Sequence, residues 1–313
     1  MSRIIFVPQY PTKLRYQEWW FHTLPDQFRK AGFDVWVLGE DWIEMFGGVA
    51  SDAAMFSPIS TAITFETEQI NEYMQTPLKE DDILFLADIS FPGFFSNVLY
   101  HKRPKKCFAF CHATSKNNLD YFSPVEFSKF PVEEAHASLF KTVFVGSQYH
   151  RDKLRWPNAE VTYLPYPNLK SYFNTKNKKH KIVSASRITP QKVDLRLERL
   201  VQENFYPIGR KDHKTWEDYY KFLSESEVLL ITAREETFGY QVVDAVINGC
   251  IPIAPNKFSY PELLPHNYLY NDEDELMELL DYIFRKNADV PKLLCDKMMV
   301  DFYSNIIKTL KEA

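Results

Sequence analysis

The sequence has no excess of basic residues and no long apolar run. Lys and Arg number 37 against 42 Asp and Glu, so the formal net charge is −5. The chain therefore lacks the global positive field of a protein that coats nucleic acid, although a local basic patch is compatible with this balance. No apolar run approaches the roughly 18–20 residues of a membrane-spanning helix. The sequence opens on a predicted strand, residues 4–7, with no signal peptide before it, so we expect a cytoplasmic protein.

Cysteine is scarce, and its spacing disfavours a metal site. Of four cysteines only Cys107 and Cys111 are close in the sequence, inside an apolar segment that is typical of a buried strand. A zinc site needs a second pair of ligands at short spacing. Cys250 and Cys295 are isolated, so we predict buried thiols and no bound metal.

Apolar and aromatic residues are abundant, at 45% and 16% of the chain, which is enough for two cores. Short apolar runs alternate with helical patterns, as is typical of parallel βαβ units. The predicted strands are residues 4–7, 35–38, 83–87, 107–111, 142–145 and 161–164, then 182–185, 228–232 and 251–254. Helices are predicted at residues 17–31, 216–224, 240–248, 274–285 and 296–311.

A polar segment rich in Pro, Asn and Lys follows residue 164 and marks a domain boundary. We predict an N-terminal domain at residues 1–167, a second domain at 168–295 and a C-terminal helix at 296–313. The last helix has a broad apolar face that includes Met299, Phe302, Ile306 and Leu310. Such a face needs a cover, and packing back across the first domain would supply it.

Residues 235–249 follow a predicted strand and open a helix. Ligands of open α/β sheets bind at the carboxyl edge, where free N–H groups and the helix dipole favour a phosphate. Gly239 allows close approach of the backbone. Glu236 lies before the helix and Asp244 in its first turns, so one carboxylate can reach a sugar and the other a ribose. Alternatively, both acids simply cap and solvate the helix terminus.

Two cations, Arg187 and Lys192, follow the first strand of the second half. At the carboxyl end of that strand they can neutralise a diphosphate leaving group. In the first half, His112 and Asp88 each follow a strand and are expected at the edge that faces the second domain, as functional or as structural groups. Basic clusters at residues 102–106 and 176–181 are either acceptor-phosphate patches or solvated loops.

The joint occurrence of these motifs resembles the retaining GT-B glycosyltransferases of the family-4 kind. The Arg-x-x-x-x-Lys turn is residues 187–192, the Glu-x-Phe-Gly stretch begins at Glu236, and the match covers most of residues 182–265. A narrower resemblance, in residues 249–262, 85–88 and 110–112, is to the queuosine-tRNA mannosyltransferase branch and similar viral glycosyltransferases. The resemblance implies an α/β GT-B fold, with two Rossmann-like domains facing across a cleft.

The resemblance also implies roles for individual residues. Glu236 would hold hydroxyls of the donor sugar, Asp244 the ribose, and His112 would approach the sugar from the first domain. The diphosphate of a UDP- or GDP-sugar would be bound without a metal by Arg187, Lys192 and the segment Phe238, Gly239 and Tyr240. The acceptor-side candidates are Gln9, Tyr10 and Asp88.

Two departures from the family pattern are visible. Asp244 stands where the family usually has a glutamate, and residues 8–12 replace the glycine-rich turn expected after the first strand.

We therefore predict retaining transfer of a sugar from a nucleotide-sugar to a hydroxyl of a modified nucleobase in DNA or tRNA. The alternatives are a cell-surface glycan or lipid-linked acceptor, a nucleotide-sugar epimerase or hydrolase on the same fold, and a binding module without activity.

Overall fold

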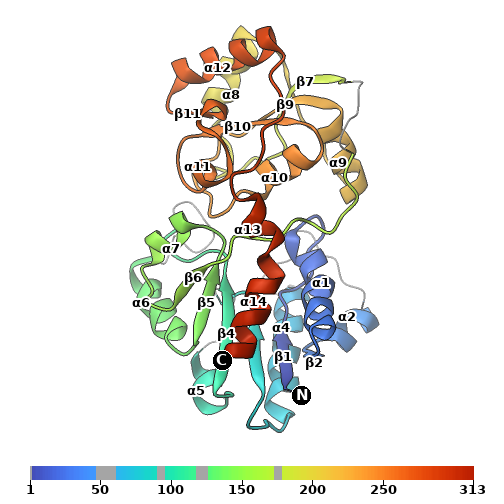
Figure 1. Cartoon of the computed structure of the whole chain (residues 1–313), viewed down its shortest axis with the longest axis vertical. Helices are drawn as coiled ribbons and strands as arrows, with labels where there is room; N and C mark the ends of the chain where they lie inside the picture. The colour runs from blue at the N-terminus through green and yellow to red at the C-terminus, as the bar shows by residue number, and fades with distance from the viewer. Residues whose placement is uncertain (1, 47–60, 90–95, 118–125, 173–177) are drawn as a thin grey trace.

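The computed structural model describes residues 2–46, 61–89, 96–117, 126–172 and 178–313, and these form two parallel β-sheets flanked by helices (Figure 1). The first sheet has the strand order β2-β1-β3-β4-β5-β6 and the second the order β11-β10-β9-β7-β8. Every strand pairing in both sheets is parallel. The predicted α/β class is confirmed.

The first sheet is built from β1 (Arg3–Val7), β2 (Asp34–Val37), β3 (Ile83–Leu86), β4 (Lys106–Cys111), β5 (Thr142–Val145) and β6 (Ala159–Val161). Its helices are α1 (Tyr16–Lys30), α2 (Glu40–Phe46), α4 (Thr61–Gln75), α5 (Ser96–His101), α6 (Glu126–Ala137) and α7 (Gln148–Leu154). Alternate residues of β1 enter two hydrophobic clusters, Ile4 and Phe6 one and Ile5 and Val7 the other. Both faces of this sheet are therefore buried, which explains the near-continuous apolar runs of its strands.

The second sheet is built from β7 (His180–Val183), β8 (Ile208–Gly209), β9 (Ser226–Leu230), β10 (Ile251–Pro255) and β11 (Leu269–Tyr270). Its helices are α8 (Leu195–Asn204), α9 (Trp216–Ser224), α10 (Tyr240–Ile247), α11 (Tyr260–Leu263) and α12 (Glu273–Lys286), with a 3₁₀ turn at His266–Tyr268. The predicted boundary at residues 167 and 168 lies in the connection between the two sheets.

The C-terminal segment returns to the first domain, as predicted. It consists of α13 (Asp296–Val300) and α14 (Phe302–Glu312), and Figure 1 shows α14 running along the first domain to a terminus beside β4. The Phe302 ring centroid lies 5.9 Å from that of Trp20 and 5.6 Å from that of Phe110. The expected single helix is interrupted only at Asp301, where the helical hydrogen bonds from Asp301 N to Lys297 O and from Asn305 N to Asp301 O are kept.

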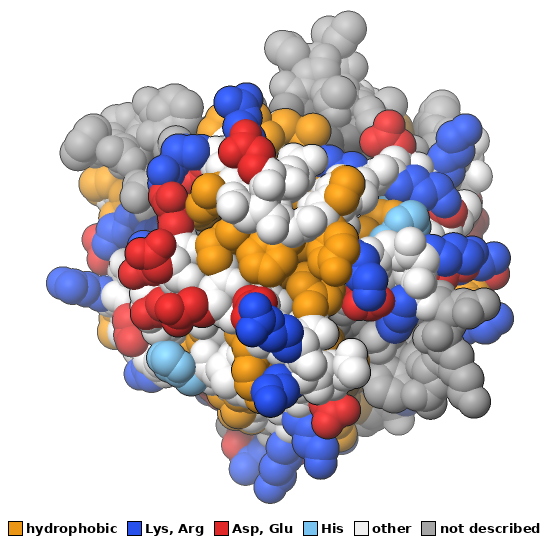
Figure 2. Space-filling model, turned by 90° about the horizontal axis from the view of Figure 1, so that it is seen from above, with side chains coloured by type: hydrophobic (Ala, Val, Ile, Leu, Met, Phe, Trp, Pro, Cys, Tyr) orange, Lys and Arg blue, Asp and Glu red, His pale blue; other side chains and the backbone are white. Residues whose placement is uncertain are grey.

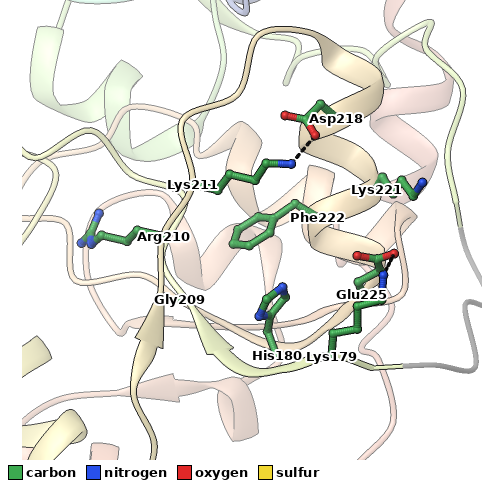
Figure 3. A pocket seen from close by; sticks show the side chains of 9 residues that line it. All are labelled: Lys179, His180, Gly209, Arg210, Lys211, Asp218, Lys221, Phe222 and Glu225. Atoms are coloured by element: carbon green, nitrogen blue, oxygen red, sulfur yellow. Dashed lines mark hydrogen bonds and ion pairs between the residues drawn. The ribbon is translucent and has the colours of Figure 1, made fainter.

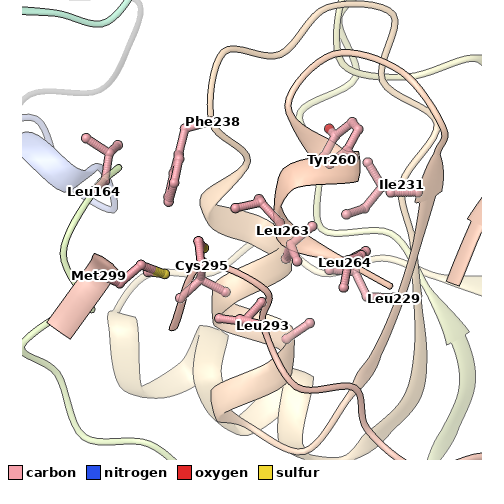
Figure 4. Packing of buried hydrophobic residues seen from close by; sticks show 14 of the residues in the cluster. Leu164, Leu229, Ile231, Phe238, Tyr260, Leu263, Leu264, Leu293, Cys295 and Met299 are labelled. Atoms are coloured by element: carbon pink, nitrogen blue, oxygen red, sulfur yellow. The ribbon is translucent and has the colours of Figure 1, made fainter. Parts of the chain in front are cut away.

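Buried side chains of both domains meet at one junction (Figure 4). Leu164, from the end of the first domain, lies beside Phe238, and Met299 of α13 extends toward Cys295, in the same cluster as Leu263 of the second domain. Gly146, which follows β5, lies so close that a Cβ there would be 3.2 Å from Leu164 Cγ and 3.3 Å from Phe238 Cβ. A residue without a side chain therefore allows this close packing.

The structure shifts one predicted strand and adds two strands that were not predicted. The strand predicted at residues 161–164 is β6 at 159–161, and Tyr163, with φ of 56°, has left the extended conformation. The two-residue strands β8 and β11 were not predicted, because two residues leave no periodic pattern. All four cysteines are free and buried, as expected. Across the described ranges, no helix combines the length and the apolar character that crossing a membrane requires.

Candidate active site

The loop between β9 and α10 is shaped by Gly239. This residue caps α10 with φ of 99°, in the left-handed region that glycine adopts most easily. A Cβ at this position would be 3.0 Å from the Tyr260 ring, so both conformation and space require glycine. Phe238 is buried with its side chain in the core, 3% exposed, so only its backbone is available at the site. Tyr240 donates its hydroxyl to the Pro165 carbonyl oxygen.

Glu236 and Lys192 form an ion pair at this loop. Lys192 Nζ lies 2.9 Å from Glu236 Oε2, and Glu236 Oε1 accepts a 3.0 Å hydrogen bond from Thr237 N. Burial alone would raise the pKa of Glu236, but the Lys192 charge and the backbone donors hold that pKa below its usual value. The structure thus brings together two of the predicted site residues as a charged pair.

The turn that carries Arg187 and Lys192 is fastened to the same loop. The Gln191 carbonyl oxygen accepts hydrogen bonds from Arg234 N at 2.9 Å and Glu235 N at 3.2 Å. Arg187 is exposed at the start of the turn, directly after β7 and Ser186. The cationic turn and the acidic loop therefore lie side by side at the carboxyl ends of β7 and β9.

Asp244 is buried in the second turn of α10, 5% exposed. Tyr220 donates to its Oδ1 at 2.8 Å and Tyr219 to its Oδ2 at 3.3 Å. Burial raises the pKa of Asp244 to about 7, against the opposing effect of the two tyrosine hydroxyls. Both oxygens of this carboxylate thus have partners from α9.

His112 lies at the end of β4 among aromatic rings. Its ring centroid is 4.5 Å from that of Tyr16 and 5.1 Å from that of Trp20. Burial lowers the pKa of His112 to about 3, so the imidazole is neutral, and its Nε2 lies 3.1 Å from the Ala87 carbonyl oxygen. A neutral ring in this contact donates from Nε2, which leaves Nδ1 as an acceptor. Tyr16 also stacks on Tyr240 of the second domain at 6.2 Å, so His112 lies one ring away from α10.

The acceptor-side candidates separate into two groups. Gln9 Nε2 donates to Asp88 Oδ2 at 2.8 Å, which joins the ends of β1 and β3. Tyr10 instead lies in the aromatic core, 4% exposed, against Trp42 and Phe65. Its ring is thus part of the packing of the first domain.

Comparisons with known proteins give a relative in sequence and relatives in fold. No family model matches the sequence. A tRNA-queuosine alpha-mannosyltransferase of Drosophila melanogaster is 26% identical over 236 residues, which are 68% of this chain and 59% of that protein. The chain thus spans about three fifths of the length of this curated relative.

Two solved structures resemble the whole chain. A sucrose-phosphate synthase from Thermosynechococcus elongatus superposes with a TM-score of 0.62 at 12% identity, covering 100% of this chain and 94% of the other. A trehalose-6-phosphate synthase gives a TM-score of 0.63 at 11% identity, covering 100% and 99%. The chain has the GT-B fold. At these identities the likeness shows the fold alone, and the site has to be argued from its residues.

Several lysines of the two basic clusters are held by hydrogen bonds or ion pairs within the chain. Lys102 donates to the backbone oxygens of Tyr73 and Met74 at 2.9 and 2.8 Å, and Lys178 to those of Ser224 and Gly249 at 2.9 and 2.6 Å. Lys176 lies outside the described residues. The remaining pairs are Lys105 with Glu80, Lys179 with Glu225 and Lys181 with Glu227.

A pocket of about 410 Å³ beside Lys179 shows the same pairing (Figure 3). Lys211 faces Asp218 across its upper part, and Lys179 faces Glu225 below. Acidic and basic side chains also intermingle on the face of the molecule drawn in Figure 2. These contacts favour the interpretation of the charge runs as solvated loops with local ion pairs.

Three residues of the site were missed as participants by the sequence analysis. Glu235 and Lys153 form a buried ion pair, 5% and 18% exposed, between the two domains. Glu66 of α4 has its pKa raised to about 8 by burial, and the negative charge of Asp88 acts in the same direction. No local motif marks these positions, because Glu235 and Lys153 are 82 residues apart and Glu66 is far from Asp88 in the sequence.

Proposed function

We propose that this GT-B chain is a glycosyltransferase that takes its sugar from a nucleotide diphosphate-sugar. The observation that carries the proposal is the meeting of Lys192 with Glu236 at the start of α10, beside the turn that begins at Arg187. Cations and free helix N–H groups at one place suit a diphosphate. The similarity to a protein named as a mannosyltransferase supports the same activity.

Each group of the loop has a defined task in this proposal. Arg187, Lys192 and the backbone N–H groups around Gly239 bind the diphosphate of a UDP- or GDP-sugar. Once Lys192 binds phosphate oxygens, Glu236 accepts hydrogen bonds from sugar hydroxyls. The charge that develops on the departing diphosphate is stabilised by fixed cations and dipoles, so the mechanism requires no metal ion.

The proposed transfer retains the configuration at the sugar carbon. The bond from the anomeric carbon to the donor phosphate oxygen breaks, and the acceptor oxygen forms its bond to that carbon on the same face. The acceptor proton passes to the departing phosphate oxygen. His112, neutral and with Nδ1 as an acceptor, approaches the sugar from the first domain and binds one of its hydroxyls.

Asp244, which we propose as the ribose ligand, already has two hydrogen-bond donors. Its two oxygens already accept hydrogen bonds from Tyr219 and Tyr220. Because a carboxylate oxygen accepts two hydrogen bonds, a ribose hydroxyl would be a third donor to this group. The carboxylate therefore has acceptor capacity left for a ribose hydroxyl.

For the acceptor we propose a hydroxyl of a modified nucleobase in tRNA or DNA. The support is the similarity to a tRNA-queuosine alpha-mannosyltransferase. Gln9 and Asp88, joined at 2.8 Å at the ends of β1 and β3, are the acceptor-side groups of this proposal. A cell-surface glycan or lipid-linked acceptor is the alternative.

A mass-spectrometric screen tests the proposal. The protein is incubated with a panel of UDP- and GDP-sugars, alone and with bulk tRNA or hydroxymethylated DNA. We expect release of nucleoside diphosphate together with a sugar-sized mass gain on one nucleic acid. Release without that gain would move the acceptor to glycans or to water. If no donor were bound or consumed, the assignment of Arg187, Lys192 and Glu236 would be wrong.

A further inference from the structure

Two consecutive carboxylates in the loop before α10 face opposite partners. Glu236 binds Lys192 of its own domain at 2.9 Å. Glu235 binds Lys153 of the first domain, whose Nζ lies 2.9 Å from Oε1 and 2.8 Å from Oε2. The backbone between the two side chains is therefore fixed from both sides.

Three side chains of the first domain contact the Glu235 carboxylate. Besides Lys153, its Oε1 has Asn117 Nδ2 at 3.2 Å and the Tyr149 hydroxyl at 3.4 Å. The Glu235 side chain is 5% exposed and that of Lys153 is 18% exposed. Because both side chains are largely shielded from water, their ion pair is screened little and holds a definite geometry.

Helix α7 makes two further contacts on either side of this pair. Its N-cap residue Ser147 donates its hydroxyl to the Thr237 carbonyl oxygen, one residue beyond Glu236. The backbone N–H groups of Gln148 and Tyr149 each donate to the Glu262 carboxylate at 2.7 Å. One helix of the first domain thus contacts the loop at two points and the following α11 at a third.

We propose that Lys153 is a positioning residue: its ion pair with Glu235 fixes the loop and so positions Glu236 at the donor sugar. The role of Glu236 in this inference rests on the proposed function. The fixing of the loop by the ion pair between Lys153 and Glu235 does not. Sugar recognition in the second domain then depends on a lysine of the first. Lys153 contacts the Glu235 side chain, whereas the turn with Lys192 meets only the backbone of Glu235 through Gln191, so the loss of Lys153 should weaken sugar binding more than nucleotide binding.

The test compares two ligands in a set of variants. Removing one charge leaves the other buried and unpaired, so the main variant is the double substitution K153Q/E235Q, which removes both charges. K153R, which keeps the charge, tests rescue. K181M, which removes an exposed ion pair to Glu227 inside the second domain, is the matched control. Calorimetry measures the affinity for free UDP and GDP and for the UDP- or GDP-sugar that the wild-type protein binds.

We expect K153Q/E235Q to weaken binding of the nucleotide-sugar by about tenfold or more, a change of about 1.4 kcal/mol, and binding of the nucleoside diphosphate by less than about twofold. K153R and K181M should resemble the wild type. Equal weakening of both ligands, or no weakening, would overturn the proposal.

Hydrogen exchange separates this proposal from the proposed function. The amides of residues 234, 235, 237 and 238 are all hydrogen bonded within the loop or to Gln191. We expect them to exchange about tenfold faster in K153Q/E235Q. If the wild-type protein bound no nucleotide-sugar, the proposed function would fail, and the exchange rates would then decide alone whether Lys153 fixes the loop. If these amides exchanged at the wild-type rate in K153Q/E235Q, the proposal that Lys153 fixes the loop would be wrong.

Discussion

The two sides of the candidate site hold their polar groups in opposite ways. In the second domain, Lys192 and Glu236 form an ion pair, and the pKa of Glu236 is lowered although the group is buried. In the first domain, burial lowers the pKa of His112 to about 3 and raises that of Glu66 to about 8. Glu236 is therefore charged at neutral pH, while His112 and Glu66 are neutral.

This difference matches a division of labour in the proposed reaction. The diphosphate is proposed to bind on the side of Lys192, where charges already in place stabilise it without reorganisation during the reaction. An uncharged hydroxyl approaches along the side where His112 is neutral and surrounded by the rings of Tyr16, Trp20 and Phe110. Removing the charge of Lys192 should therefore affect the reaction much more than changing the protonation of His112.

The largest effect is expected for Lys192→Met. The substitution removes a cation that is 2.9 Å from Glu236 and is proposed to stabilise the leaving diphosphate. Loss of one such group typically costs about 10²–10³ in kcat. The measurement is release of nucleoside diphosphate under saturating donor, with K181M as control. A decrease below about threefold would contradict the role of Lys192.

The next largest effect concerns Asp244 and stability. Burial raises the pKa of Asp244 from its ordinary value of 3.8 to about 7, so the folded state binds the proton more tightly than the unfolded state does. This contribution to stability is complete below about pH 4 and is lost as the pH rises through 7. At about 1.4 kcal/mol per pH unit the total is on the order of 4–5 kcal/mol at most.

Asp244→Asn tests this sign, because asparagine has no charge to bury. We expect the variant to gain stability relative to the wild type between pH 5 and pH 8, measured by urea unfolding at each pH. Tyr219→Phe, which removes the longer of the two hydrogen bonds, is the comparison variant and should increase the pH dependence. The same wild-type-to-variant difference at both pH values would show that Asp244 is ionised throughout.

The comparison also separates what the sequence could predict from what it could not. Lys192, Glu236 and Gly239 were found from local motifs, because strand, turn and helix N-terminus follow each other directly in the chain. The strands of the first sheet were found because burial on both faces makes continuous apolar runs. These features depend on neighbours in sequence.

The parts that escaped depend on distant partners. Glu235 stands next to Glu236 and looks the same in the sequence, yet its partner Lys153 is 82 residues away. Tyr10 follows β1 as Gln9 does, but the packing of Trp42 and Phe65 draws its ring into the core. The two tyrosines on Asp244 come from α9, which no motif connects with α10. Tertiary contacts of this kind leave no periodic signal.

A smaller effect is expected at the junction of the two domains. A Cβ on Gly146 would lie 3.2 Å from Leu164 Cγ and 3.3 Å from Phe238 Cβ. Gly146→Ala should therefore destabilise the protein by about 1–2 kcal/mol through overpacking, measured by urea unfolding. In the double variant with Leu164→Ala, the extra methyl group has room, so the two effects should be clearly non-additive. Simple additivity would mean that the backbone moves apart at no cost.

The smallest effect is expected for the protonation of His112. Because burial lowers its pKa to about 3, the ring should remain neutral from pH 5 to pH 8, and its carbon-bound proton resonances should not shift over that range. His112→Gln keeps a donor and an acceptor and assigns the resonances, while the exposed His22 on the same helix that supplies Tyr16 serves as reference. A titration of His112 near neutral pH would contradict the contrast between a charged Glu236 and a neutral His112. An activity profile flat in pH across this range, apart from groups of the donor loop, would agree with a histidine that binds a hydroxyl through a neutral ring and transfers no proton.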